Sequence, residues 1–282
     1  MHTYKASTST NASIKTLQIL NIAGYIFMVL MNFLANWLPL GGNTTGELSE
    51  KYSNLFVPSG PTFSIWGLIY LLLLGFTIFQ ASTLFSSKPS GVNTLVRQLG
   101  IWYFASSVLN GLWIVAWHYE LLPVSVAIMW ILLLSLLFAN FGISNIDQLM
   151  SKRVRFLAKS PFGIYLGWIS VATIANMTTW LTAIQWQGGL EQDTWAVLMI
   201  LIGAAVSAYA ASRLANGYLS LAVVWAFAGI VSKRMDVEPV YYSIAFVAGA
   251  LALVLFILSL ILIGKELRYE KEQETHPSPL YE

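Results

Sequence analysis

Long apolar segments are the feature of this sequence that most restricts its fold. A helix needs about 20 apolar residues to cross the hydrocarbon core of a bilayer. Eight such segments recur, over Thr16–Leu38, Phe63–Phe85, Gln98–Trp117, Leu121–Ile143, Phe162–Ala183, Thr194–Ser212, Gly217–Ser232 and Tyr241–Gly264. Only 10% of the 282 residues are charged, against about 25% in soluble domains. We therefore predict an all-α polytopic membrane protein with about eight transmembrane helices, surrounded by the lipid bilayer.

The basic residues predict the orientation of these helices. Twelve of the 15 Lys and Arg residues fall at the end that holds both termini, and three fall at the other. Cytoplasmic loops are rich in Lys and Arg, so we expect a multi-pass inner-membrane protein with both termini in the cytoplasm. Residues 1–15 are then a cytoplasmic tail, and residues 265–282 are a charged, disordered one. The basic loop 144–160 is interpreted as a topology signal, although it could also lie against anionic headgroups.

Several functional classes lack support in the sequence. There are no cysteines, and two of the three histidines, His2 and His276, lie in the polar tails, so we expect no metal site. The third, His118, ends a predicted helix and is interpreted as an interfacial residue rather than a ligand. No charged residue lies mid-helix, which argues against ion-coupled transport and acid–base catalysis. The net charge of +2 gives no case for nucleic acid as a partner. We predict no catalytic residues.

Four predicted helices carry aromatic and amide side chains at helical spacing. Steps of three, four and seven residues keep side chains on one face, and amides that faced lipid would be costly. The residues are Tyr25, Asn32 and Asn36; Trp66, Tyr70 and Thr77; Trp102, Ser106, Asn110, Trp113 and Trp117; and Tyr165, Trp168, Ala172, Asn176 and Trp180. Two interpretations compete: contacts between helices, or a shared pocket for a flat apolar ligand such as a tetrapyrrole or sterol. In the sixth segment, Gly203, Ser207 and Ala211 predict a packing surface that docks the last three helices on the first five.

Three motifs resemble those of a known family. Residues 61–70 read PTFSIWGLIY, residues 109–113 read LNGLW and residues 165–176 read YLGWISVATIAN. In this order they resemble the tryptophan-rich sensory protein family (TspO/MBR, the translocator-protein family). The resemblance covers residues 16–185 and implies a five-helix bundle, with three additional helices in residues 194–264. The sequence departs from the family at Ile164, where the family has Pro, and in its longer, more basic loop before the fifth helix.

The resemblance implies a pocket for porphyrins or sterols beneath the long loop 39–62. Carried over by motif, the ligand contacts are Trp66, Asn110, Trp113, Trp168 and Asn176. Tyr70, Asn32 and Trp180 join them from the helical stripes. The predicted role is a sensor or carrier of a hydrophobic small molecule, with no cofactor beyond a tetrapyrrole ligand. A second copy of the chain is an implied partner, because family members often dimerise. The alternatives are a permease for an uncharged solute, a light-dependent porphyrin-degrading enzyme, and a structural subunit of a complex.

Overall fold

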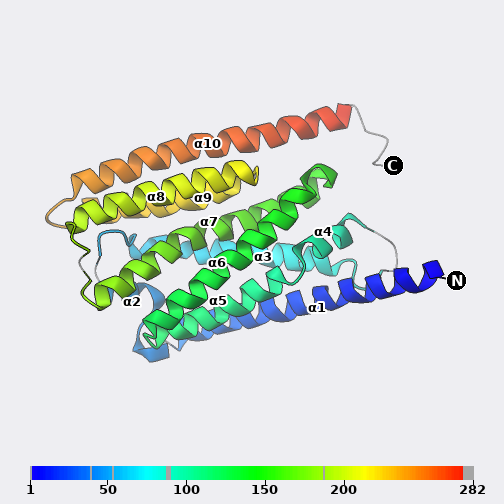
Figure 1. The fold of residues 1–282 in the computed structure, drawn as a ribbon, viewed down its shortest axis with the longest axis horizontal. Coiled ribbons are helices and arrows are strands. Elements are labelled where there is room, and N and C mark those ends of the chain that lie inside the picture. Colours follow the sequence, from blue (N-terminus) through cyan, green and yellow to red (C-terminus); the bar gives the residue numbers. More distant parts are fainter. Residues whose placement is uncertain (1, 39, 53, 87–89, 187, 276–282) are drawn as a thin grey trace.

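The computed structural model describes residues 2–38, 40–52, 54–86, 90–186 and 188–275, and every regular element in these ranges is helical. Most helices run side by side along the long axis of the molecule (Figure 1). The longer elements are α1 (His2–Trp37), α3 (Ile65–Ala81), α5 (Trp102–His118), α6 (Leu122–Asn145), α7 (Lys152–Ala183), α8 (Gln192–Arg213), α9 (Gly217–Met235) and α10 (Tyr242–Thr275). The shorter ones are η1 (Leu40–Gly42), α2 (Thr45–Lys51), η2 (Gly60–Ser64), α4 (Gly91–Leu99) and η3 (Asp147–Leu149).

The architecture is that of an all-α polytopic membrane protein, and each of the eight predicted segments corresponds to one long helix, although the third also includes the end of α4. Within the described residues, six helices are long and apolar enough to cross a membrane, and a seventh span results if the bent pair α4–α5 counts as one. The helix that falls short is α7, which carries Trp, Asn and Thr side chains. Because residues 158–169 of α7 are all buried, this helix needs less apolar surface than a helix that faces lipid.

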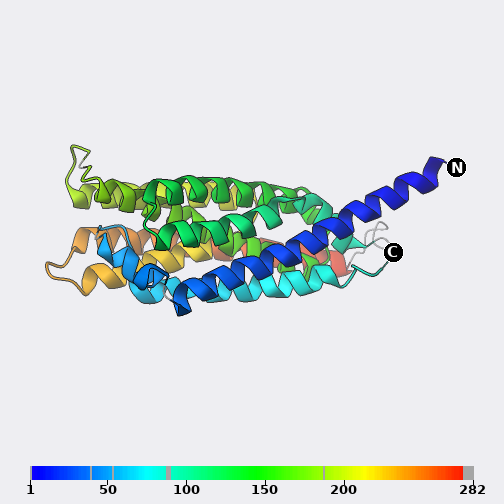
Figure 2. The same ribbon diagram turned by 90° about the horizontal axis from the view of Figure 1, so that it is seen from below.

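The two ends of the bundle differ. The N-terminus and the C-terminal end of α10 lie at one end, which we call the terminal end (Figure 1). The other end holds α2 and the connection between α9 and α10 (Figure 1); we call it the lid end. The view from below shows α1 extending past the bundle at the terminal end (Figure 2). Helix α1 begins at His2, so most of the predicted tail 1–15 is helical.

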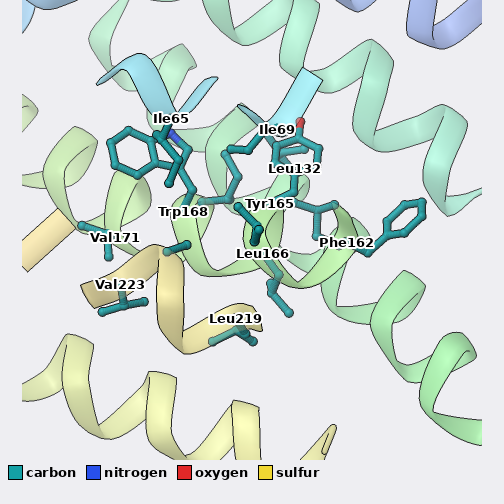
Figure 3. Packing of buried hydrophobic residues seen from close by; sticks show 14 of the residues in the cluster. Ile65, Ile69, Leu132, Phe162, Tyr165, Leu166, Trp168, Val171, Leu219 and Val223 are labelled. Carbon is teal, nitrogen blue, oxygen red and sulfur yellow. The ribbon is translucent and has the colours of Figure 1, made fainter. Parts of the chain in front are cut away.

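Helix α7 joins the first five predicted segments to the last three. Figure 3 shows Leu166 and Val171 of α7 beside Leu219 and Val223 of α9. A Cβ added at Gly167 would lie 3.0 Å from the Leu219 carbonyl carbon and closer still to its oxygen, so the two backbones approach as only a glycine permits. Helices α8 and α10 pack against α9. The predicted small-residue surface of α8 is buried at Ser207 and Ala211, but α9 supplies the closer docking contact.

The third predicted segment is not one straight helix. Helix α4 ends at Leu99 and is bent by 52° from α5. Gly100 between them has a φ of 54°, a left-handed backbone angle that glycine adopts without strain. The inward face of α4 buries Leu95 and Val96, and Gly142 of α6 leaves room for the backbone at Gln98. The third predicted span therefore corresponds to α5, which begins at Trp102 instead of Gln98.

The basic connection 144–160 is not a simple loop. Its second half is the first part of α7, and the side chains of Arg155 and Lys159 are buried. Asp147 lies 2.9 Å from Arg155 Nε and 3.0 Å from Lys159 Nζ, and Glu266 of α10 lies 3.1 Å from Lys159 Nζ. Buried charges persist only when paired, so these residues form part of the fold. Helix α10 continues to Thr275, which corrects the prediction of disorder from residue 265; residues 276–282 lie outside the described ranges.

Candidate ligand-binding site

The ring of Trp66, on the first turn of α3, is the centre of an aromatic cluster. Its centroid lies 5.6 Å from that of Tyr70, 5.9 Å from Trp113, 6.0 Å from Tyr165 and 6.0 Å from Trp168. These distances are typical of interacting aromatic pairs. The rings come from α3, α5 and α7, so three of the predicted stripes converge on one place.

Amide side chains link the same helices through buried hydrogen bonds. Asn32 Nδ2 of α1 donates to Asn110 Oδ1 of α5 at 2.7 Å. The Trp113 indole N–H donates to Asn176 Oδ1 at 2.8 Å, and Asn176 Nδ2 donates to Ser125 Oγ of α6 at 2.9 Å. In hydrocarbon these groups would have no water to bond. The amides therefore both hold the helices together and position the rings around Trp66.

Two adjoining cavities lie around the aromatic cluster. The large cavity, of about 660 Å³, lies between α1, α2 and α3 and includes Asn32 and Tyr70 in its lining. The small cavity, of about 30 Å³, is lined by residues including Trp113, Trp168 and Asn176. Trp66 lines both cavities, as do Phe63 and Thr45. The side chains that we expected around a single pocket are thus divided between two spaces.

The remaining predicted residues lie elsewhere. Asn110 is fully buried and lines neither cavity, although it holds Asn32 in place. Trp180 is half-buried on α7 and lines neither cavity. Trp102 stacks on Phe138 of α6 at 4.7 Å, away from the cluster. Some side chains of the stripes therefore join helices, and others line the cavities.

One buried donor in the small cavity is unpaired. The indole nitrogen of Trp168 has no hydrogen-bond partner among the described residues, and its side chain is 2% exposed. A buried donor without an acceptor costs about 1–3 kcal/mol. A ligand with a carbonyl or other acceptor that reached this cavity would remove that cost.

A short helical segment formed by η1 and α2, which we call the lid, lies at the large cavity, and α2 contributes Thr45, Gly46, Glu47 and Glu50 to the lining. Thr44 and Glu47 form a capping box at the start of α2, and these hydrogen bonds lower the pKa of the Glu47 carboxyl. His118 Nδ1, at the end of α5, donates to the carbonyl of Leu40 at 2.9 Å. In the neutral ring Nε2 then accepts from Thr45 Oγ1 at 3.1 Å. The buried His118 thus tethers the lid to α5.

The segment that joins α2 to α3 is also attached to α9. The Ser59 amide donates to the carbonyl of Gly229 at 3.1 Å, and the Trp225 indole donates to the carbonyl of Thr62 at 2.8 Å. A Cβ at Gly229 would overlap the Thr62 side chain. Helix α9 therefore takes part in holding the segment that joins α2 to α3.

The sequence model of the TSPO-like protein family matches residues 18–261. The chain belongs to the TSPO-like protein family. The match extends well past residue 185, where the motifs of the sequence analysis end, and includes α8, α9 and most of α10. Comparison with curated proteins and with solved structures found no match.

Sequence reasoning missed a second polar cluster in this TSPO-like protein, near the terminal end. Gln18 Nε2 of α1 donates to the carbonyl of Gln80 on α3 at 2.6 Å and to Thr83 Oγ1 at 2.8 Å. Asn21 Nδ2 donates to Gln80 Oε1 at 2.9 Å. Gln18 and Asn21 precede Tyr25 by seven and four residues, so the stripe on α1 could have been extended to include them.

Proposed function

We propose that this TSPO-like protein binds a flat hydrophobic ligand, of the porphyrin or sterol kind, in the cavities around Trp66 and acts as its sensor or carrier. The observation that carries the proposal is the aromatic cluster at the wall of a cavity of about 660 Å³. Binding sites for small molecules are clefts of about 300–1,000 Å³ with apolar walls and a few oriented polar groups. Asn32 and the unpaired indole of Trp168 supply such groups.

The position of Trp66 supports a mechanism in which this side chain separates the two cavities. Together with Phe63, its ring stands between the large cavity and the small one. A side-chain rotation at Trp66 would join them and bring the Trp168 indole within reach of a ligand. In this mechanism the lid excludes water from the bound molecule, and the aromatic rings bind its flat faces.

Orientation follows from the charge distribution. We place the terminal end in the cytoplasm of a cell with the chain in its inner membrane, because basic residues gather there. The lid and the large cavity then face the opposite side. A ligand of low solubility would reach the cavity from that surface or from the adjoining bilayer leaflet.

The alternatives find less support. A permease needs an open polar path, and the contact between α1 and α3 towards the terminal end is filled by the hydrogen-bonded Gln18 and Gln80. An enzyme needs groups that transfer protons or electrons, and a photochemical role for Trp66 would have to be observed directly. We therefore propose a binding protein and not an enzyme.

A thermal-shift and absorbance assay tests the proposal. The purified protein in an uncharged detergent is titrated with a panel of tetrapyrroles, their neutral esters and sterols. A ligand at 100 times its Kd stabilises the folded state by about 2.7 kcal/mol, which raises the Tm measurably. For a tetrapyrrole the absorbance maximum should shift as the ring leaves the micelle.

Matched tryptophan variants locate the site. We expect Trp66→Leu to weaken binding about tenfold or more, the equivalent of at least about 1.4 kcal/mol. Trp130→Leu is the control, because Trp130 is exposed on the outer face of α6. Equal affinity in both variants, or no ligand-dependent shift with any compound, would show the proposal to be wrong.

A further inference from the structure

Two carboxylates lie at the lining of the large cavity. Glu47 and Glu50 both belong to α2, and both line the cavity together with Asn32, Asn36 and the aromatic rings. The Glu47 carboxylate accepts hydrogen bonds from the Thr44 amide and hydroxyl at 2.7 and 2.9 Å. These bonds stabilise the charged form. Both glutamates are solvent-exposed, so the lid brings negative charge to the edge of a cavity whose other walls carry aromatic rings, apolar groups and two amides.

We propose that the ligand of the large cavity is an amphiphile with a positively charged amine or quaternary ammonium group on an aromatic or apolar body. This inference rests on the proposed function and narrows its ligand class. Its structural basis is the placement of Glu47 and Glu50 on one wall and of Phe33, Phe63, Trp66 and Tyr70 on the others. Carboxylates and aromatic faces are the two groups that bind organic cations.

The nearby cations compensate this negative charge only in part. Lys51 is paired with Glu120, with 2.6 Å between its Nζ and Oε2. Lys233 of α9 lies in the field of Glu50 but is not part of the cavity lining. Arg234 is buried beside the ring of Tyr241. No basic side chain among the described residues lines the large cavity.

The lid end as a whole carries a net negative charge. The sequence places seven acidic residues there (Glu47, Glu50, Glu120, Glu191, Asp193, Asp236 and Glu238) against three basic ones (Lys51, Lys233 and Arg234). A surface of one sign attracts molecules of the opposite charge and repels those of the same charge. Porphyrins with free carboxylate side chains are therefore disfavoured relative to neutral or cationic compounds of the same size.

Three derivatives of one ring test the inference. The probes are pyrenylmethylammonium, pyrenemethanol and pyreneacetate, which share the pyrene ring and differ in charge. Binding to the full-length protein in a maltoside detergent is followed by pyrene fluorescence and by energy transfer from Trp. We expect the cation to bind about fivefold to tenfold more tightly than the alcohol, the carboxylate to bind more weakly, and the difference to shrink between 20 and 500 mM salt.

Conservative variants identify the groups responsible. Gln also supports a capping box at this position, so the double variant Glu47→Gln/Glu50→Gln should keep the lid folded. We expect it to remove the preference for the cation and to leave the affinity for the alcohol unchanged. The variant Gly67→Leu is the blocking control, because Gly67 lines the cavity and has open space beside it. It should weaken binding of all three probes.

Each outcome has a distinct meaning. Equal affinity of the wild type for the three probes overturns the inference and leaves the proposed function standing. A preference for the cation that persists in the double Gln variant also overturns it. Binding that is unaffected by Gly67→Leu places the probes outside the large cavity and overturns the site assignment. If no probe binds, the inference is overturned, and the thermal-shift panel of tetrapyrroles and sterols decides the proposed function separately.

Discussion

The contact between α7 and α9 gives a sharp stability prediction at Gly167. A Cβ at this position would lie 3.0 Å from the Leu219 carbonyl carbon and 3.0 Å from Ala222 Cβ, and nearer still to the Leu219 oxygen. Optimal carbon–carbon distances are about 3.5–4.0 Å, so the helices would have to separate by about 0.5–1 Å. The opposing atoms are backbone and Cβ, and no change of rotamer can move them.

We expect Gly167→Ala to destabilise the protein by about 2 kcal/mol. Overpacking typically costs about 1–3 kcal/mol, with a value near 3 where only backbone can move. Replacing a helical Gly by Ala returns up to about 1 kcal/mol through helix propensity. The net loss should appear as a lower Tm in detergent micelles and as an earlier transition in denaturant.

Gly75→Ala is the matched control. Gly75 lies within α3, another predicted transmembrane helix, and nothing lies within 4 Å of a Cβ added there. This variant should be as stable as the wild type, or slightly more stable. If Gly167→Ala were as stable as Gly75→Ala, the close approach of α7 and α9 would be refuted, and with it our account of how the last three helices attach to the rest.

Three further predictions concern hydrogen bonds and charges. In a double-mutant cycle, Asn176→Leu and Trp113→Phe should show a coupling of about 0.6–1.7 kcal/mol, whereas additive changes in unfolding free energy would show that the two side chains do not interact. Lys159→Met should lower the unfolding free energy by about 3 kcal/mol, because it leaves Glu266 unpaired. The double variant Lys159→Met/Glu266→Gln should recover much of this loss, and no recovery would contradict the pairing. The pKa of Glu120 is lowered chiefly by its hydrogen bonds to Lys51 and Tyr52, so its stabilisation is present above the unfolded pKa of about 4.3 and is lost as pH falls through the lower folded pKa. The difference in unfolding free energy between wild type and Glu120→Gln should therefore be under about 1 kcal/mol, as for a surface pair. The corresponding difference in Tm should vanish in acid, and a difference that grows in acid would contradict this assignment.

Hydropathy predicted most of the fold because lipid imposes length and composition on each spanning helix. The short predicted helix at Gly217 is a full helix of 19 residues, and the motifs led to the correct family. The break at Gly100 was missed because α4 is amphipathic and only nine residues long. The ion cluster was missed because Lys159 and its partner Glu266 are far apart in the sequence, and periodicity within one helix carries no information about such pairs.

The candidate site was predictable as a set of helix faces but not as a volume. Steps of three and four residues placed Trp66, Trp113 and Trp168 on inward faces, and the structure brings these rings together. Trp66, Phe63 and Thr45 line both cavities, and no sequence pattern specifies how such side chains divide the space. The lid contacts of His118 were missed because its partners lie in a loop whose path cannot be inferred from spacing.

The double anchoring of the lid has a mechanical consequence. One anchor, through His118, belongs to α5, and the other, through Gly229 and Trp225, belongs to α9. The chain from η1 to η2 is thus held at both ends. Any relative displacement of α5 and α9 must therefore extend or relax this segment. A chain shortened after residue 185 would keep every ring around Trp66 and yet lose one of the two attachments that hold the segment beside the large cavity in place.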